Sequence, residues 1–86
     1  MNRVWITAKT ARFLRLVGLE PGITAAEVHR RIGKDYAHGS HQFTYATLKR
    51  MRKNGLIERI APRGGLRGIG FRVAVDAIAL FREMGK

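Results

Sequence analysis

The stretch Thr44–Ile60, TYATLKRMRKNGLIERI, decides the fold. Apolar residues at Leu48 and Met51 recur at helical spacing, and Gly55 follows where a helix commonly ends. The short run Leu56–Ile60 comes next without a linker, and its apolar residues with charged interruptions are typical of a β-strand. The stretch therefore predicts a helix that passes directly into a strand.

The residues on either side supply the other elements. Thr24 and Glu27 have the spacing of a capping box, in which each side chain accepts a hydrogen bond from the other residue's backbone at the start of a helix. The glycine-rich run Ala61–Gly68 separates two apolar runs and is typical of a hairpin loop. Working outward, we expect helices at 7–17, 25–32, 41–54 and 77–84, and a two-stranded hairpin at 56–75.

Composition limits the class of protein. The chain of 86 residues suits one domain, 1–86, and its 17 Lys and Arg against 6 Asp and Glu give a net charge of +11. Such an excess indicates an anionic partner. Because there is no cysteine, a disulfide framework and a thiolate metal site are excluded. The apolar start Val4–Ile6 is too short to span a membrane, so we expect no membrane association and a cytoplasmic, nucleoid-associated protein.

The third helix and the order of elements resemble a winged helix-turn-helix domain, most closely the PadR family, with MarR and ArsR domains next. The matching pattern is Y-x-x-L-x-R-[LM]-x-x-x-G-L-[IV], formed by Tyr45, Leu48, Arg50, Met51, Gly55, Leu56 and Ile57. The resemblance implies an α+β, mainly α fold, with a three-helix core, a two-stranded β-wing and a C-terminal helix. Only a short form of the family's long C-terminal helical region is present, so we expect no small-molecule effector.

The third helix carries polar and basic side chains opposite its apolar side. In a recognition helix, Gln42 would pair with adenine and Arg50 with guanine, while Ala46 or Phe43 would contact a thymine methyl. The alternative interpretation is a solvated cationic face without a ligand. From this helix and its start, we predict DNA contacts by Ser40, His41, Gln42, Phe43, Ala46, Lys49, Arg50 and Lys53.

Two further groups of cations suit phosphate binding. Arg30, Arg31 and Lys34 end the second helix, where they also favour the helix dipole. Arg63 and Arg67 flank two glycines in the hairpin loop, as expected for a wing that enters the minor groove or holds phosphate. The alternative for the loop is a flexible tip that needs glycine for its backbone conformation.

The histidines give weak support to metal binding or catalysis. His38 and His41 lie near Asp35, but neither a cysteine nor a second carboxylate completes a set of metal ligands. A nuclease that uses this histidine pair would also need a phosphate-binding group around both rings. We therefore expect no metal, no cofactor and no enzymatic activity, and we expect His29 to be packed beside the core.

The first and last helices carry more apolar residues than a small core needs. Such a surplus is typical of a protein interface, and the resemblance implies a homodimer that pairs through these helices. The expected interface consists of Phe13, Leu16, Ile78, Leu80, Phe81 and Met84. The alternative is a monomer in which the last helix folds back on the first.

Together, these features predict a sequence-specific double-stranded DNA-binding transcriptional regulator. Helix three would read base edges, and helix two and the wing would hold phosphates. Two alternatives remain open. One is a basic RNA-binding protein of the ribosomal type, and the other is an architectural, replication or excision factor of a mobile element.

Overall fold

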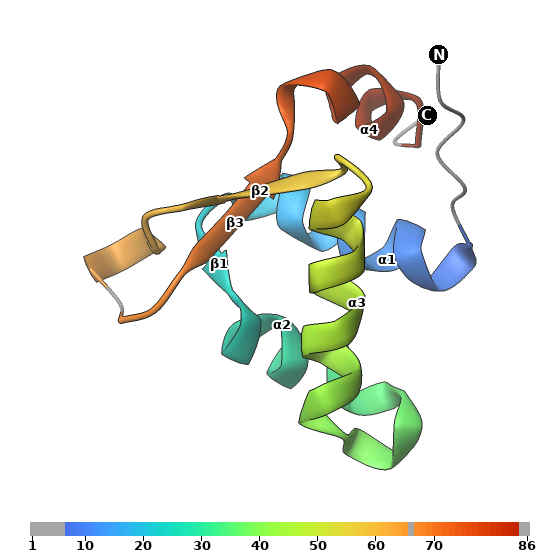
Figure 1. The fold of residues 1–86 in the computed structure, drawn as a ribbon, viewed down its shortest axis with the longest axis vertical. Coiled ribbons are helices and arrows are strands. Elements are labelled where there is room, and N and C mark those ends of the chain that lie inside the picture. The colour runs from blue at the N-terminus through green and yellow to red at the C-terminus, as the bar shows by residue number, and fades with distance from the viewer. Residues whose placement is uncertain (1–6, 66, 85–86) are drawn as a thin grey trace.

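The computed structural model describes residues 7–65 and 67–84, in which helices dominate and a small antiparallel sheet completes an α+β fold (Figure 1). The elements are α1 (Ala8–Leu19), β1 (Ile23–Thr24), α2 (Ala25–Arg31), α3 (His41–Lys53), β2 (Ile57–Ile60), β3 (Gly70–Val73) and α4 (Ile78–Met84). Short 3-10 turns join α2 to α3 and β3 to α4. Among the described residues, no helix combines the length and apolar character needed to cross a membrane.

The first two helices begin at side-chain caps. Thr7 Oγ1 accepts a hydrogen bond of 3.1 Å from the backbone N–H of Thr10 at the start of α1. At the start of α2, Thr24 Oγ1 accepts from the Glu27 N–H at 3.3 Å, and Glu27 Oε1 accepts from the Thr24 N–H at 3.1 Å. The predicted capping box is therefore confirmed. It satisfies two backbone donors that a helix start would otherwise leave without partners.

The end of α3 has the geometry that its sequence predicts. Gly55 has a φ of +77°, which glycine adopts without strain. The Leu56 N–H donates to the Met51 carbonyl at 2.9 Å, and the Gly55 N–H donates to the Arg52 carbonyl at 3.0 Å. These two bonds form a Schellman motif, which ends the helix and turns the chain at once into β2. The strand that follows α3 is thereby placed beside it.

The first helix was expected to end at residue 17, but α1 continues through Gly18 to Leu19. A Cβ atom on Gly18 would lie only 2.1–2.6 Å from three ring atoms of Phe81. The glycine therefore provides room for α4 to pack directly on α1. Its role is close packing between two helices that are distant in the sequence.

The sheet has three strands, in the order β1-β3-β2, where two were expected. Ile23 of β1 pairs with Phe71 of β3, and Val73 of β3 pairs with Ile57 of β2. The two-residue strand β1 was missed because its second residue, Thr24, is also the cap of α2, so the sequence signals only a turn and a helix start. Beyond the sheet, the β2–β3 hairpin extends away from the helices (Figure 1).

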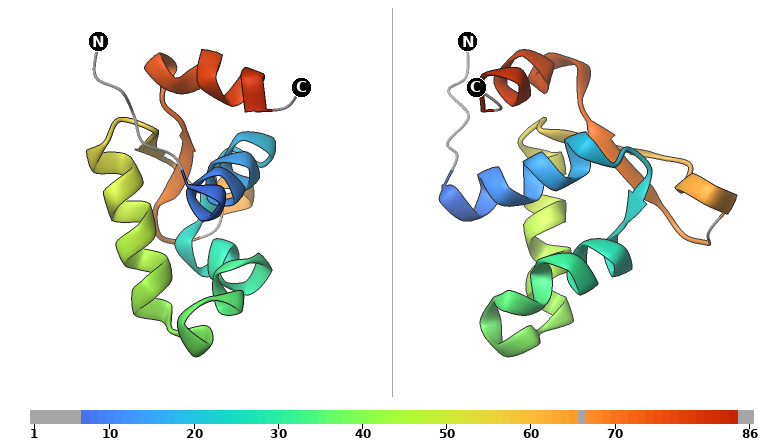
Figure 2. Two further views of the ribbon diagram at one scale, coloured as in Figure 1. Left: turned by 90° about the vertical axis from the view of Figure 1, so that its right-hand side faces the viewer. Right: turned by 180° about the vertical axis from the view of Figure 1, so that it is seen from behind.

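The core lies where α1 crosses between α2 and α4, against α3 and the sheet (Figure 2). Phe13 is fully buried there, so its expected place at a dimer interface is wrong. The buried side of α1 consists of Phe13, Leu14 and Val17. It is wider than expected, because Phe13 was assigned to the dimer interface and not to the core. The buried apolar residues are Phe13, Leu14, Val17, Ile23, Val28, Ile32, Leu48, Met51, Leu56, Ile57 and Ala77.

Candidate nucleic-acid interface

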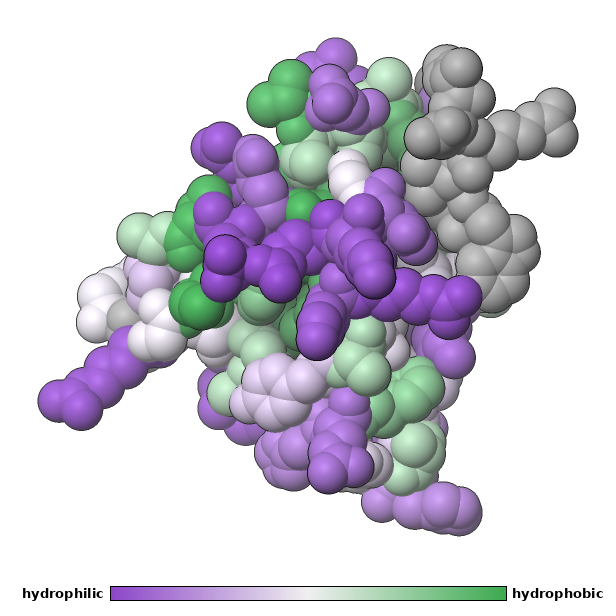
Figure 3. Space-filling view, viewed as in Figure 1, coloured by the Kyte–Doolittle hydropathy of each residue, from purple (hydrophilic) through white to green (hydrophobic). Residues whose placement is uncertain are grey.

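The outward face of α3 is polar and mostly cationic. Its inner side buries Thr44, Leu48 and Met51, so residues about half a turn away point to solvent. Hydrophilic side chains gather over this helix in the space-filling view (Figure 3). The exposed residues of the set predicted on α3 are His41, Gln42, Ala46, Lys49, Arg50 and Lys53.

Phe43 and Tyr45 lie on the opposite sides from those expected. Each is one residue from the buried Thr44, roughly 100° around the helix, at an edge of the apolar stripe. Phe43 is half-buried, and its ring lies 5.5 Å from that of Tyr36. Helical spacing puts Tyr45 on the same side as Leu48 and Met51, but Tyr45 is 52% exposed. At such edges the neighbouring elements decide which side chain is covered, and Tyr36 covers Phe43.

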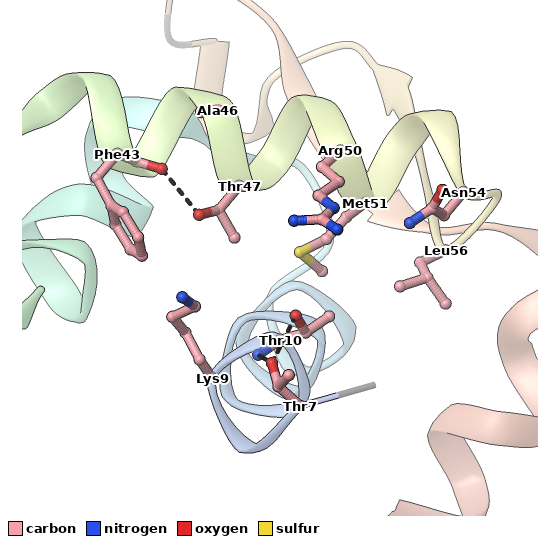
Figure 4. Close-up of a pocket in the computed structure, with 10 residues that line it drawn as sticks. All are labelled: Thr7, Lys9, Thr10, Phe43, Ala46, Thr47, Arg50, Met51, Asn54 and Leu56. Atoms are coloured by element: carbon pink, nitrogen blue, oxygen red, sulfur yellow. Dashed lines mark hydrogen bonds between the residues drawn. The ribbon is translucent and has the colours of Figure 1, made fainter. Parts of the chain in front are cut away.

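A pocket of about 210 Å³ lies between the first turn of α1 and α3 (Figure 4). Arg50 points into this pocket from α3, so its guanidinium group lies on the α1 side of the helix. Lys9 points into it from α1, with its Nζ 4.7 Å from the centre of the Phe43 ring. Lys9 was not among the predicted residues, because the sequence does not show that the first turn of α1 faces α3. The lining residues are Thr7, Lys9, Thr10, Phe43, Ala46, Thr47, Arg50, Met51, Asn54 and Leu56.

Two histidines join the start of α3 to α2. His29 is buried, with its Nδ1 2.7 Å from Thr44 Oγ1, which confirms its expected packed position. His41 is exposed and stacks on His29 with 3.8 Å between ring centroids. Ser40 occupies the N-cap position of α3 but makes no side-chain capping bond. Within residues 7–65 and 67–84, no three His, Cys, Asp or Glu side chains gather closely enough to hold a metal ion.

The cations at the end of α2 differ in their surroundings. Arg30, Arg31 and Lys34 are all exposed. Arg31 forms an ion pair of 2.7 Å with Glu20, at the turn between α1 and β1. A nearby carboxylate offsets part of its charge, so Arg31 is less available to a phosphate than its exposure suggests.

The two hairpin arginines also differ. Arg67 is exposed in the loop between β2 and β3. Arg63, by contrast, lies against the α1–β1 turn, with Nη1 2.7 Å from Glu20 and Nη2 2.9 Å from Glu27. The expectation that both arginines extend from the tip is therefore wrong for Arg63. The sequence could not show this, because its partners lie 43 and 36 residues earlier.

The ion pairs shift the titration of both carboxylates. The hydrogen bond from Arg63 is the main reason that the pKa of Glu20 falls below its ordinary value, and the charge of Arg31 adds to the shift. Hydrogen bonds from Arg63 and then from the Thr24 backbone lower the pKa of Glu27. Both groups therefore remain ionised further into the acid range than free glutamates do.

Most of the apolar residues expected at a dimer interface pack within the chain. Phe13 is buried, as described above, and Leu16, Leu80 and Phe81 are half-buried against the core. Ile78 remains 37% exposed, and the side chain of Met84 lies outside the described residues. Phe81 is covered because α4 packs on α1 at Gly18.

The cationic face of α3 and the anchored hairpin beside it form the candidate interface. The chain matches no protein-family model, no curated protein and no solved structure.

Proposed function

We propose that this chain is a winged-helix protein that binds double-stranded DNA in a sequence-specific way and regulates transcription. The observation that carries the proposal is the exposed basic face of α3 beside a projecting β2–β3 hairpin. An α-helix with its side chains is about 10–12 Å in diameter, and the major groove is about 12 Å wide, so α3 can lie in the groove. The hairpin then serves as the wing and reaches the minor groove or the phosphates.

The residues of the interface take different roles in this proposal. Gln42, in the first turn of α3, pairs with adenine, and Ala46 packs against a thymine methyl. Lys49 and Lys53, one turn apart on the same face of α3, hold neighbouring phosphates, and Arg50 contacts guanine from the α1 side of the helix. Further phosphate contacts come from Arg30, Lys34 and Arg67, all of which are exposed.

The geometry favours DNA over double-stranded RNA. The proposed reader is an α-helix, and the deep, narrow major groove of A-form RNA does not admit side chains to its base edges. Selection of bound sequences from a random DNA pool, with structured RNA as competitor, tests the choice. Enrichment of one DNA motif that RNA fails to displace supports the proposal. Retention of RNA with no enriched DNA motif would favour a ribosomal-type RNA-binding role.

Replacement of Gln42 by alanine should relax base preference at one position of the selected motif. Loss of a bidentate contact with adenine costs about 1–3 kcal/mol for the preferred base and little for the others. Fluorescence anisotropy with the preferred duplex and with single-base variants of it measures both effects.

Lys53→Ala provides the matched control, because Lys53 lies on the same exposed face of α3 and is assigned to phosphate. This variant should lower the affinity for all duplexes by a similar factor and leave the base preference intact. If Gln42→Ala behaved in the same even way, Gln42 would not read a base.

We also propose that the protein binds DNA as a homodimer through residues that stay exposed near the α1–α4 contact. Leu19 is 67% exposed, Val75 is 69% exposed and Ile78 is 37% exposed. Leu19 ends α1, and Val75 and Ile78 stand at the entry to α4, which packs on α1. A twofold dimer would place two copies of α3 about 34 Å apart and require an inverted-repeat site.

The double variant Val75→Glu/Ile78→Glu should be a folded monomer with weaker binding to an inverted repeat, by about 10- to 100-fold, because only one protomer is held at a time. Analytical ultracentrifugation and anisotropy measure the two effects. Ala79→Glu is the control, since Ala79 is exposed on α4 but contributes little apolar surface. Sedimentation of the wild type as a single 9.7 kDa species, free and on DNA, would rule out the dimer.

A further inference from the structure

Two carboxylates bind the base of the β2–β3 hairpin to the turn between α1 and β1. Arg63 donates to Glu20 at 2.7 Å and to Glu27 at 2.9 Å, and Arg31 donates to the other oxygen of Glu20 at 2.7 Å. The side chains of Glu20 and Glu27 are only 23% and 13% exposed. The arginine partners are more open, with Arg63 36% and Arg31 52% exposed, so salt screens these ion pairs in part.

Backbone contacts hold the same junction. The Arg63 N–H donates to the Gly22 carbonyl at 3.0 Å, and the Gly22 N–H donates to the Phe71 carbonyl at 2.8 Å. Gly22 has a φ of +88°, and a Cβ there would lie 2.9 Å from the Arg63 Cβ. A Cβ on Gly70 would lie 2.6 Å from the Gly22 carbonyl oxygen. The hairpin base is thus seated closely on the turn, where only the glycine backbone fits.

Glu27 connects this junction to α2. Its Oε1 accepts the N–H of Thr24 in the capping box, while its Oε2 accepts from Arg63. One carboxylate therefore fixes both the first turn of α2 and the direction in which the hairpin leaves the domain. Because α2 packs on α3, the hairpin direction is also fixed relative to the helix that carries the basic face.

We infer that Glu20 and Glu27 are positioning residues for the wing: they hold Arg63 so that the hairpin, with Arg67, keeps its direction before DNA arrives. This inference rests on the proposed function. A hairpin that is already oriented loses less conformational freedom on binding, so its contact with phosphate contributes more to affinity. Arg63 is then a residue that anchors the hairpin, and Arg67 is the residue that meets the DNA.

Simple electrostatics predicts the opposite result for these carboxylates. Removing two negative charges from a DNA-binding surface should strengthen the attraction to phosphate. Positioning predicts that the same change makes Arg67 ineffective. The two effects are separated by a double-mutant cycle between the carboxylates and Arg67, because a general charge effect is additive and a positioning effect is not.

The cycle compares Arg67→Ala in three backgrounds: the wild type, Glu20→Gln/Glu27→Gln and Glu58→Gln. Glutamine at position 27 can still accept the capping bond, so α2 keeps its start. Glu58 is the control carboxylate, since it pairs with Arg72 across β2 and β3 and not with the α1–β1 turn.

On the selected duplex, Arg67→Ala should weaken binding about 5- to 10-fold in the wild type and in Glu58→Gln, as expected for one lost arginine contact. In the Glu20→Gln/Glu27→Gln background, Arg67→Ala should weaken binding by less than about two-fold, because the two sites are coupled. An equal loss in all three backgrounds would overturn the inference.

A measurement without DNA tests the anchor by itself. A carboxylate whose folded pKa is lowered contributes stability above its ordinary value of 4.5, and that contribution is lost as the pH falls through the lowered pKa. The amide NMR signals of Gly22 and Arg63 should therefore titrate below pH 4.5 in the wild type and stay constant there in Glu20→Gln/Glu27→Gln.

The outcomes separate the two proposals. If this titration occurs but the protein binds no DNA, the ion pairs are supported and the proposed function is contradicted. If the protein binds DNA and the double-mutant cycle is additive, the proposed function is supported and the positioning role of Glu20 and Glu27 is contradicted.

Discussion

Raising NaCl from 50 to 200 mM should weaken DNA binding by about three to four orders of magnitude for each protomer that is bound. The chain carries a net charge of +11, and exposed cations occur on α2, α3 and the hairpin. If each protomer neutralises roughly 5–8 phosphates, the release of counterions gives a slope of about −0.9 per phosphate in a plot of log affinity against log salt. Anisotropy titrations at four or more salt concentrations give this slope directly.

Single lysine variants identify the source of the slope. Lys49→Ala should reduce its magnitude by about 0.9 for each bound protomer, because each protomer loses one phosphate contact. Gln42→Ala should lower affinity without changing the slope, since Gln42 is uncharged. An affinity that stays constant across this salt range would exclude nucleic acid as the main partner of the basic surface.

Phe13→Ala should lower the free energy of unfolding by about 3–5 kcal/mol. Phe13 is fully buried in the core, so truncation removes apolar contacts and leaves a cavity that the small domain cannot easily close. Domains of this size are stable by only about 5–15 kcal/mol, so much of the fold's stability would be lost. Urea denaturation followed by circular dichroism measures the change.

Leu19→Ala is the matched control on the same helix. Leu19 is 67% exposed in the single protomer, so its truncation should change the stability of the monomer by no more than about 0.5 kcal/mol. The two variants also separate core from interface. If Phe13→Ala kept full stability and altered only self-association, Phe13 would belong to a dimer surface after all.

Features that depend on neighbours along the chain could be predicted from the sequence. The capping box at Thr24 and Glu27 and the helix end at Gly55 each involve atoms within five residues of one another. The helical periodicity around Leu48 and Met51 likewise placed these two residues in the core correctly, although it misplaced Phe43 and Tyr45 at the edges of the buried face. Local hydrogen bonds and periodicity are properties of the segment itself, so its residues reveal them.

Features that depend on distant partners could not be predicted. In the sequence, Gly18 is typical of a helix end, whereas in the structure it makes room for the ring of Phe81. Arg63 resembles a free wing cation until Glu20 and Glu27 are placed beside it. A single sequence shows which residues are present but not which of them lie close together, because these contacts form only when the elements pack.

The glycines of the hairpin region divide it into two parts with different tolerance of change. At Gly64, Gly65 and Gly68, an added Cβ would meet no atom within 4 Å, although all three have positive φ. At Gly70, a Cβ would collide with backbone. The tip can therefore accept asparagine or aspartate, which tolerate positive φ, or a grafted loop, while the base must keep the glycine at position 70. Evolution and protein engineering can thus exchange the tip as an independent module and alter the surface that the proposed wing presents, without rebuilding the domain that carries it.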